Sequence, residues 1–452
     1  MDIFRASQLN LPEVYDFIHT HLLSYQPHYI RLKDYYDGTH DILLREQTDT
    51  SKPNNKLVNN FADYIVNQAA AYFMGTPVSY TSENAALLEK VQDILNYNDE
   101  ADLNSQHAEN IGIYGSSFEL HYIDKEDEMM DTRFAVVSPQ EMFIVYNYDL
   151  VPSPLYAVRY YEVPNQEDKS TYKVEIYTES SVLYYTLSGQ QWLLEQEIPH
   201  FYNDVPVIEV MNNNDRMGDF EKVLTLIDAY NNLESDSMND FDYFSDAYLF
   251  LKGASIDSET AIDMKTNRLI NVVEPDADAS FLTKNIQDAA LENYKNRIVN
   301  DIHKFSAVPN LTDEAFAGNL SGVAIKYKLM GLENIAGKKE RRFKKALQRR
   351  LELLTSLLFV RGLIPKSNYF DIDISFKRTI PSNELEQVQM VRDLTGSVSQ
   401  ITLLSLLSFI DDPAAEMKKI EEETAAQDTY SSAFASPVDV IGDATREQTQ
   451  TI

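Results

Sequence analysis

Apolar residues recur at three- and four-residue spacing through the N-terminal part of the chain, which predicts helices that each bury one face. Val14, Ile18 and Leu22 form the first such stripe. A second predicted helix ends at Gly38, because glycine readily adopts the left-handed conformation that closes a helix. Further amphipathic helices are expected at residues 59–74 and 84–95.

Residues 117–211 carry a different pattern, in which Tyr, Val and Ile alternate with polar residues. Alternation with a period of two places successive side chains on opposite faces of a strand, so we expect an antiparallel β region here. Charged interruptions at 124–131 and 164–169 suit turns. The clearest predicted strands are 118–123, 156–163, 172–177 and 182–187.

Helical periodicity returns in three long segments of the second half of the chain. The first, 220–251, would be about 45 Å long at ~1.5 Å per residue. An insert at 252–285, with one predicted strand at 268–273, separates it from a second helix at 286–308. A loop at 309–321 then leads into the longest helix, which begins at Gly322 and ends near Arg361.

The C-terminal part is predicted to hold a strand at 369–377, two or three short helices within 383–420, and a mobile tail. Helices and a separate antiparallel β region in a chain of 452 residues indicate an α+β protein with several domains.

Charge and composition narrow the possible functions. The chain has 71 Asp and Glu against 39 Lys and Arg, a formal net charge of −32, which argues against tight binding of DNA phosphates. The absence of cysteine excludes disulfides, thiolate nucleophiles and Cys-bearing zinc sites. The longest apolar run, 401–410, is far shorter than the ~20 residues of a membrane span, so we expect a soluble protein without a membrane partner.

No motif predicts an enzyme site. Gly331 and the Gly337-Lys338 pair resemble a phosphate-binding loop, but the spacing is one residue too long and Lys339 stands where Ser or Thr must bind magnesium. Ser321 is not in a nucleophile elbow and is expected to be a helix N-cap. We therefore predict no catalytic residues and no cofactor.

Two groups of residues are weak candidates for a metal site. His19 and His21 project from different faces of a helix, so no metal pair is predicted there. Carboxylates on one side of the 220–251 helix could hold a divalent cation, act as acid and base, or face solvent. The solvent-facing reading is favoured because no calcium loop or histidine accompanies them. These carboxylates are Asp236, Asp240, Asp242 and Asp246.

One strongly basic run lies on the longest predicted helix, with only Glu340 opposing it. A cationic helix face is often merely solvated, but in so acidic a chain it could also dock an acidic neighbour or a DNA backbone. The run comprises Lys338, Lys339, Arg341, Arg342, Lys344, Lys345, Arg349 and Arg350.

Several short motifs follow one another in a distinctive order along the chain. They are YYDG at 35–38, YFMGTPV at 72–78, GSSFE at 115–119, GDFE at 218–221 and GNLSGVAIK at 318–326. This order resembles the portal proteins of tailed bacteriophages, specifically the branch from long noncontractile-tailed phages of Gram-positive hosts. The resemblance extends from about residue 29 to residue 420, and its most specific part is the segment 309–326.

This resemblance implies a ring, usually of about twelve subunits, at one capsid vertex through which double-stranded DNA enters and leaves. It implies a wing at 1–219, a stem made of helices 220–251 and 286–308, a clip at 252–285, a tunnel loop at 309–321, a long wing helix and strand at 322–382, small crown helices at 383–425 and a mobile tail at 426–452. The tunnel-loop residues expected at the DNA channel are Asn310, Asp313, Glu314, Gly318, Asn319, Ser321 and Gly322.

The resemblance also implies partners and a location. The clip would bind the large subunit of the packaging terminase and later a head-completion adaptor, and the wing would meet the major capsid and scaffolding proteins. The protein would be part of the virion, assembled in the host cytoplasm. Two alternatives from the residues alone stay open: a monomeric acidic interaction adaptor and an acidic hydrolase.

Overall fold

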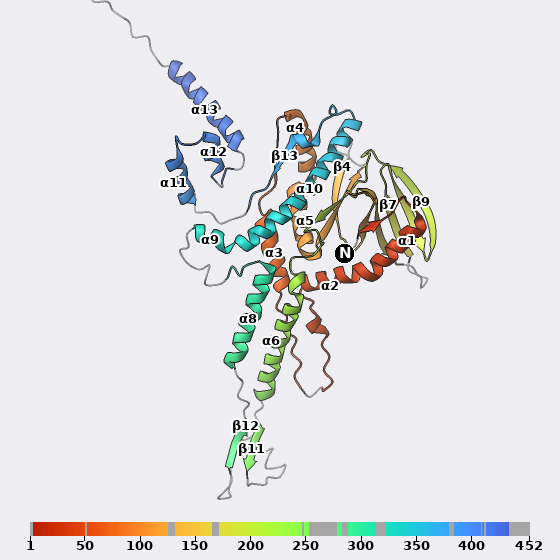
Figure 1. Ribbon diagram of the computed structural model, residues 1–452, viewed down its shortest axis with the longest axis vertical. Coiled ribbons are helices and arrows are strands. Elements are labelled where there is room, and N and C mark those ends of the chain that lie inside the picture. Colours follow the sequence, from red (N-terminus) through yellow and green to blue (C-terminus); the bar gives the residue numbers. More distant parts are fainter. Residues whose placement is uncertain are drawn as a thin grey trace, which may run out of the picture. The chain divides into compact units, whose positions relative to one another are not determined.

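A computed structural model describes residues 3–49, 52–124, 132–164, 171–245, 248–252, 278–282, 288–312, 322–378, 384–407, 409–410 and 413–433. The chain divides into two units, Met1–Thr379 and Ile380–Ile452, and each is described by itself. Both helices and strands are present, in agreement with the predicted mixture (Figure 1).

The predicted N-terminal helices are confirmed. Helix α1 (Leu11–Thr20) continues through the π-helical turn η1 (His21–Tyr25) into α2 (Gln26–Tyr36). After the 3-10 turn η2 (Asp41–Leu44), α3 (Phe61–Met74) and α4 (Ala85–Tyr97) begin where Asn60 and Asn84 accept hydrogen bonds from backbone amides of the first turn.

Helix α5 (Glu100–Tyr114) was not predicted. The buried residues in the first half of the helix include Glu100, Asn104 and His107, so no apolar stripe runs along its full length. The helix ends at Gly115, whose φ of 82° requires a residue without a side chain.

The predicted antiparallel region forms two sheets. The six-stranded sheet has the order β1-β5-β6-β7-β8-β9, and all its pairs are antiparallel except β1 with β5. Helix α1 packs on one face of it, where Val14 and Ile18 join an apolar core cluster with Val158 and Val174. Its strands are β1 (Phe4–Arg5), β5 (Met142–Tyr146), β6 (Pro154–Val163), β7 (Thr171–Tyr177), β8 (Ser181–Ser188) and β9 (Gln191–Pro199).

The remaining strands of this region form a three-stranded sheet in the order β10-β3-β4, from β10 (Val207–Met211), β3 (Ser116–Ile123) and β4 (Thr132–Val137). The predicted strand near residue 372 is β13 (Ile372–Ser375), which follows the turn η4 (Tyr369–Asp371) and pairs with β2 (Ser79–Ser82). One apolar core cluster joins α3, α4, α5 and these strands to the long helix α10 (Met330–Val360).

The predicted helix 220–251 needs a correction. A 3-10 turn, η3 (Glu221–Val223), precedes α6 (Leu224–Ser245), and the last part of the predicted helix is the strand β11 (Tyr248–Lys252). This strand pairs antiparallel with β12 (Asp278–Leu282). The run Tyr-Leu-Phe-Leu is compatible with either a helix or a strand when it is read alone, and pairing with β12 makes it a strand. The strand predicted at 268–273 lies outside the described residues.

The other two long helices are α8 (Asp288–Ser306) and α10 (Met330–Val360), as expected. The longest predicted helix is interrupted, because a separate helix α9 (Gly322–Lys328) precedes α10 and the single residue Leu329 lies between them. Here Gly331 approaches the backbone of Ala307, and a Cβ on Gly331 would lie 3.3 Å from the Ala307 carbonyl oxygen.

The second unit contains α11 (Glu384–Leu394), α12 (Gln400–Ser405) and α13 (Pro413–Ala433). The short helices predicted in this region are confirmed, but α13 extends into the segment predicted to be a mobile tail. Throughout the described ranges, no helix is both long enough and apolar enough to cross a membrane.

Candidate functional site

Helices α6 and α8 lie side by side (Figure 1), and they include most of the residues that the resemblance assigns to a stem. Lys295 on α8 lies 3.1 Å from the Glu234 carboxylate on α6 and 3.2 Å from Glu292 on its own helix. Desolvation by itself would lower the pKa of Lys295, but hydrogen bonds to these two carboxylates raise it. The ammonium group therefore stays charged and joins the two helices.

An extended segment, residues 54–59, runs along α6, and we name it the strap. Backbone amides at every second strap residue donate to side chains at every fourth residue of the helix. The bonds join Asn59 N to Asn231 Oδ1 (2.8 Å), Leu57 N to Ser235 Oγ (2.9 Å) and Asn55 N to Asn239 Oδ1 (2.7 Å).

The spacing of the donors along the strap matches the spacing of the acceptors along the helix. Four helical residues advance about 6 Å and two extended residues about 6.7 Å, so the donors and acceptors stay in step over three pairs. Arg45 links the strap to α6, since its side chain donates to Asn54 Oδ1 and the Asn55 carbonyl oxygen on the strap and to Asp236 on the helix. The strap thereby fixes the axial position of α6.

The carboxylates considered as a cation site are partly used in this contact. Asp236 pairs with Arg45 at 2.8 Å, and Asp242 accepts a hydrogen bond of 2.6 Å from Asn55. Asp246 lies outside the described residues. Across the part of the chain that the structure describes, no group of three or more His, Asp or Glu residues is placed to hold a metal ion.

The start of the predicted tunnel loop is tied to α3. The Tyr64 hydroxyl donates to the Pro309 carbonyl oxygen at 3.1 Å and accepts from the Leu311 amide at 2.8 Å. Asn310 Oδ1 accepts from the amide and the hydroxyl of Thr312, which forms a local turn. Gly322 is the first residue of α9. The predicted residues Asp313, Glu314, Gly318, Asn319 and Ser321 lie outside the described residues.

The basic run does not form one face, and this prediction needs a correction. Lys339 and Arg350 are buried, with 1% and 2% of their surface exposed. Arg342 donates to Asn214, Lys344 to the Ile374 carbonyl oxygen, and Arg349 pairs with Asp204 and Glu352. The exposed members, Lys338, Arg341 and Lys345, lie three and four residues apart on one side of α10, and we name them the basic stripe.

The sequence contains a signal for the two buried cations that the analysis missed. Lys339 and Arg350 fall at the same three- and four-residue spacing as Ala336, Phe343 and Leu347, all of which are buried. A charged residue in an apolar stripe requires a buried partner of opposite charge. The sequence alone does not show which acidic residue supplies it.

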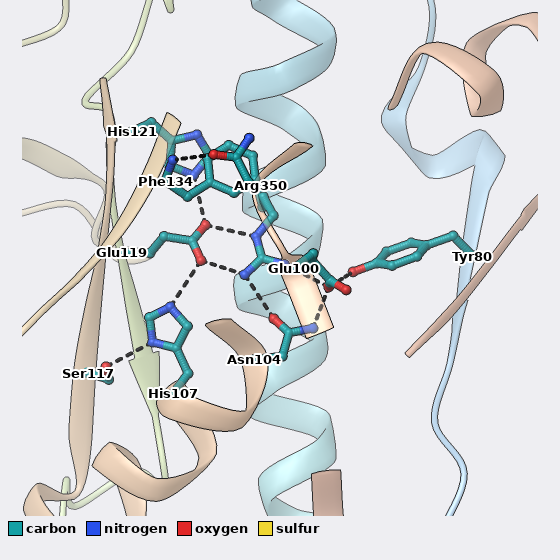
Figure 2. A network of polar contacts seen from close by, with 10 residues as sticks. Tyr80, Glu100, Asn104, His107, Ser117, Glu119, His121, Phe134 and Arg350 are labelled. Carbon is teal, nitrogen blue, oxygen red and sulfur yellow. Dashed lines mark hydrogen bonds and ion pairs between the residues drawn. The ribbon is translucent and has the colours of Figure 1, made fainter. Parts of the chain in front are cut away.

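Arg350 is the centre of a buried polar network between α10, α5 and β3 (Figure 2). Its guanidinium donates to both oxygens of Glu119 on β3 and to Asn104 and Glu100 on α5. His107 and His121 contact the same Glu119 carboxylate at 3.0 and 2.8 Å. Further bonds of the network join Tyr80 and Asn104 to Glu100, and His107 to Ser117.

The network is arranged around an ionised Glu119. Burial alone would raise the pKa of the Glu119 carboxyl, but the charge and hydrogen bonds of Arg350 hold it well below its usual range. Burial lowers the pKa of His121, which favours the neutral ring. The Nδ1 atom of His121 has no hydrogen-bond partner in the structure, which fits a neutral ring that donates from Nε2 to Glu119.

A second buried ion pair joins α10 to the segment that enters α6. Lys339 pairs with Asp219, which also accepts from Asn212 and donates its amide to the Gly112 carbonyl oxygen. Gly218 packs so closely on α5 that a Cβ would lie 2.4 Å from the Ile113 carbonyl oxygen. This junction connects the long helix α10, the end of α5 and the start of the helix pair.

A family model described as "Phage portal protein, SPP1 Gp6-like" matches residues 15–430. The chain belongs to this family. It is 26% identical over 413 residues to the portal protein of Bacillus phage SPP1, which covers 86% of this chain and 80% of that protein. It is 25% identical over 430 residues to the portal protein of Clostridium phage phiCD119, covering 88% and 93%. The interpretation as a phage portal protein from the branch of Gram-positive hosts is confirmed.

Solved structures of gene transfer agent particles are also similar to this chain. One, the neck of an empty particle computed with C6 symmetry, has a TM-score of 0.44 at 14% identity and covers 76% of this chain and 89% of that chain. Another, the virion of a native particle, has a TM-score of 0.46 at 11% identity and covers 84% and 92%.

Proposed function

We propose that the protein forms a closed ring of about twelve subunits at one vertex of a tailed-phage capsid, and that double-stranded DNA passes through the ring during packaging and ejection. Membership of the portal family over residues 15–430 carries this proposal. The paired helices α6 and α8 support it, because they have the arrangement expected of a stem.

The parts of the ring follow the boundaries expected from the sequence. Residues 1–219 form the wing, α6 and α8 the stem, 252–285 the clip, 309–321 the tunnel loop, 322–382 the wing helix and strand, and 383–425 the crown. The clip binds the terminase large subunit and then the head-completion adaptor, while the wing contacts the major capsid and scaffolding proteins. Assembly takes place in the host cytoplasm.

The acidity of the chain suits a passive channel. A formal charge of −32 in each subunit would give the ring on the order of several hundred negative charges. These charges would repel the DNA phosphates at every point of the channel. DNA would then slide without strong binding sites. The energy for packaging comes from the separate terminase, and this chain acts without catalysis.

Two surfaces are proposed to act on neighbours. The tunnel loop forms the collar nearest to DNA, with Gly318 providing backbone freedom and Asp313 and Glu314 keeping the contact loose by repulsion. The basic stripe contacts acidic groups of an adjacent subunit or the DNA backbone. Lys339 and Arg350, which the sequence analysis included, hold the fold together and are left out of this surface.

A packaging assay with purified variants tests these assignments. We expect Gly318→Val to leave ring formation intact and to slow DNA packaging, whereas charge reversal of Lys338, Arg341 and Lys345 impairs ring assembly or packaging. Reversal of three exposed lysines outside the stripe, Lys90, Lys366 and Lys418, is the matched control. Packaging at the parental rate by the loop variant would refute the collar, and the same result for the stripe variant would leave the stripe a solvated face.

A further inference from the structure

Helix α1 covers only part of the six-stranded sheet on which it packs. Strands lie about 4.8 Å apart, so six of them extend about 24 Å, while a helix covers about 10 Å. Over β5, β6 and β7 the sheet is fully covered, since Val145, Val158 and Val174 are completely buried in the core under α1. Toward β8 and β9, Tyr185 and Trp192 on the same face are only partly buried.

An open apolar groove of about 660 Å³ lies between the helix and this outer part of the sheet. Ile18, Leu22 and Leu23 from α1 and η1 line one side, and Tyr172 and Leu187 line the other. Leu23 is 66% exposed, although its neighbours in the groove are apolar. On β9, Leu194 extends this apolar surface, because it pairs with Tyr185 and is 49% exposed.

Among the described residues, helix spacing and strand register place three carboxylates around the groove, beside the His19 ring that lines it. Asp16 on α1 lies seven residues before Leu23 on η1, Glu162 pairs with Tyr172 across β6 and β7, and Glu197 pairs with Leu183 across β8 and β9. All three are exposed. A partner with basic residues beside an apolar stripe therefore complements both the lining and the rim.

The dimensions favour a helix as the occupant. A helix beside α1 would continue the helical layer at the usual ~8–10 Å between axes and cover the exposed side chains of β8 and β9. A second copy of this chain, with its net charge of −32, is a poor match for an acidic rim.

We propose that the groove between α1–η1 and strands β7 and β8 binds an amphipathic helix of a separate protein, whose apolar stripe is flanked by Lys and Arg. The helix inserts apolar side chains between Leu23 and Leu187, and its cations face Asp16 and Glu162. This docking surface is independent of the ring and the DNA channel proposed above, so either proposal can fail alone.

Fluorescence polarisation with two labelled helical peptides tests the proposal on the full-length protein. Both peptides carry the same leucine stripe, and one has Lys and Arg beside it while the other has Glu. We expect the basic peptide to bind at least about tenfold more tightly than the acidic one. Leu23→Asp should weaken its binding by about tenfold or more, and Asp16→Lys with Glu162→Lys should reverse the preference.

Leu44→Asp is the matched control, because Leu44 is 78% exposed in η2 and does not line the groove. It should bind the basic peptide like the parental protein. Since Leu23 is exposed, Leu23→Asp should keep the parental melting temperature, and Leu194→Asp provides a second variant. Equal binding by the Leu23→Asp and parental proteins, or equal affinity for both peptides, overturns the proposal. So does a change of oligomeric mass in Leu23→Asp without any peptide binding, which would assign the groove to another copy of the chain.

Discussion

The Glu119–Arg350 pair connects β3 and α10, two elements that are distant in sequence, and both side chains are buried. Removing one partner of such a pair leaves the other as an uncompensated charge in the core, at a cost of about 3–5 kcal/mol. We therefore expect Arg350→Met to lower the free energy of unfolding by about that amount in urea titrations. Arg341→Met, on the exposed basic stripe of the same helix, should change it by less than about 0.5 kcal/mol.

The double variant Glu119→Gln with Arg350→Met distinguishes loss of the charge pair from loss of side-chain volume. Neutralising Glu119 removes the unpaired charge, so part of the lost stability should return. If Arg350→Met is as stable as the parental protein, the network does not hold α10 against β3.

His21 gives the fold a defined response to pH. Its ring is buried, with Nδ1 2.6 Å from the Tyr160 hydroxyl, and burial lowers its pKa from the ordinary 6.5 to about 4. Below pH 6.5 the unfolded chain takes up this proton before the folded chain does, so stability falls as the pH decreases. We expect the free energy of unfolding to drop by about 3 kcal/mol from this group between pH 7 and pH 4.

The measurement is the difference between the parental protein and His21→Gln at pH 7, 5.5 and 4, in which contributions from other groups cancel. The stability gap between the two proteins should narrow as the pH falls. A gap that stays constant across this range would show that His21 is not held neutral by burial.

At the scale of elements, the strap depends on three side chains of α6. Asn231→Ala or Ser235→Ala removes an acceptor for a strap amide, at a cost of about 1–2 kcal/mol. Hydrogen exchange should then accelerate at the amides of Leu57 and Asn59, while the six-stranded sheet keeps its protection. The control is Asn232→Ala, since Asn232 donates within its own helix to the Asp228 carbonyl oxygen. Unchanged exchange in the strap after Asn231→Ala would contradict its dependence on these bonds.

Elements with a regular apolar pattern could be predicted from the sequence, and those stabilised by polar burial could not. Helices α3 and α4, strands β6 to β8 and the pair α6 and α8 have clear periodicity and were located correctly, apart from the end of α6. Helix α5 buries Glu100, Asn104 and His107, so periodicity of apolar residues does not reveal it. Lys339 and Arg350 were placed on a surface because their partners, Asp219 and Glu119, are distant in sequence.

For the candidate site, the sequence located the paired helices, because a helical period is a local signal. The strap was not foreseen. Its bonds involve backbone amides, which have no sequence signature, and they match Asn231, Ser235 and Asn239 only once the chain has folded. The family could be inferred from the order of motifs along the chain, because that order can be read without knowing any tertiary contact.

For the whole molecule, the proposed function requires a closed ring of subunits around an open channel. A heterologous interface closes into such a ring when its rotation completes a full circle after a whole number of subunits. Electron microscopy of the purified full-length protein tests this most directly. We expect end views with about twelve equivalent subunits around a central hole. Images that contain only particles of about the 51.8 kDa monomer mass or of dimers, over a range of salt and protein concentrations, would overturn the proposed ring.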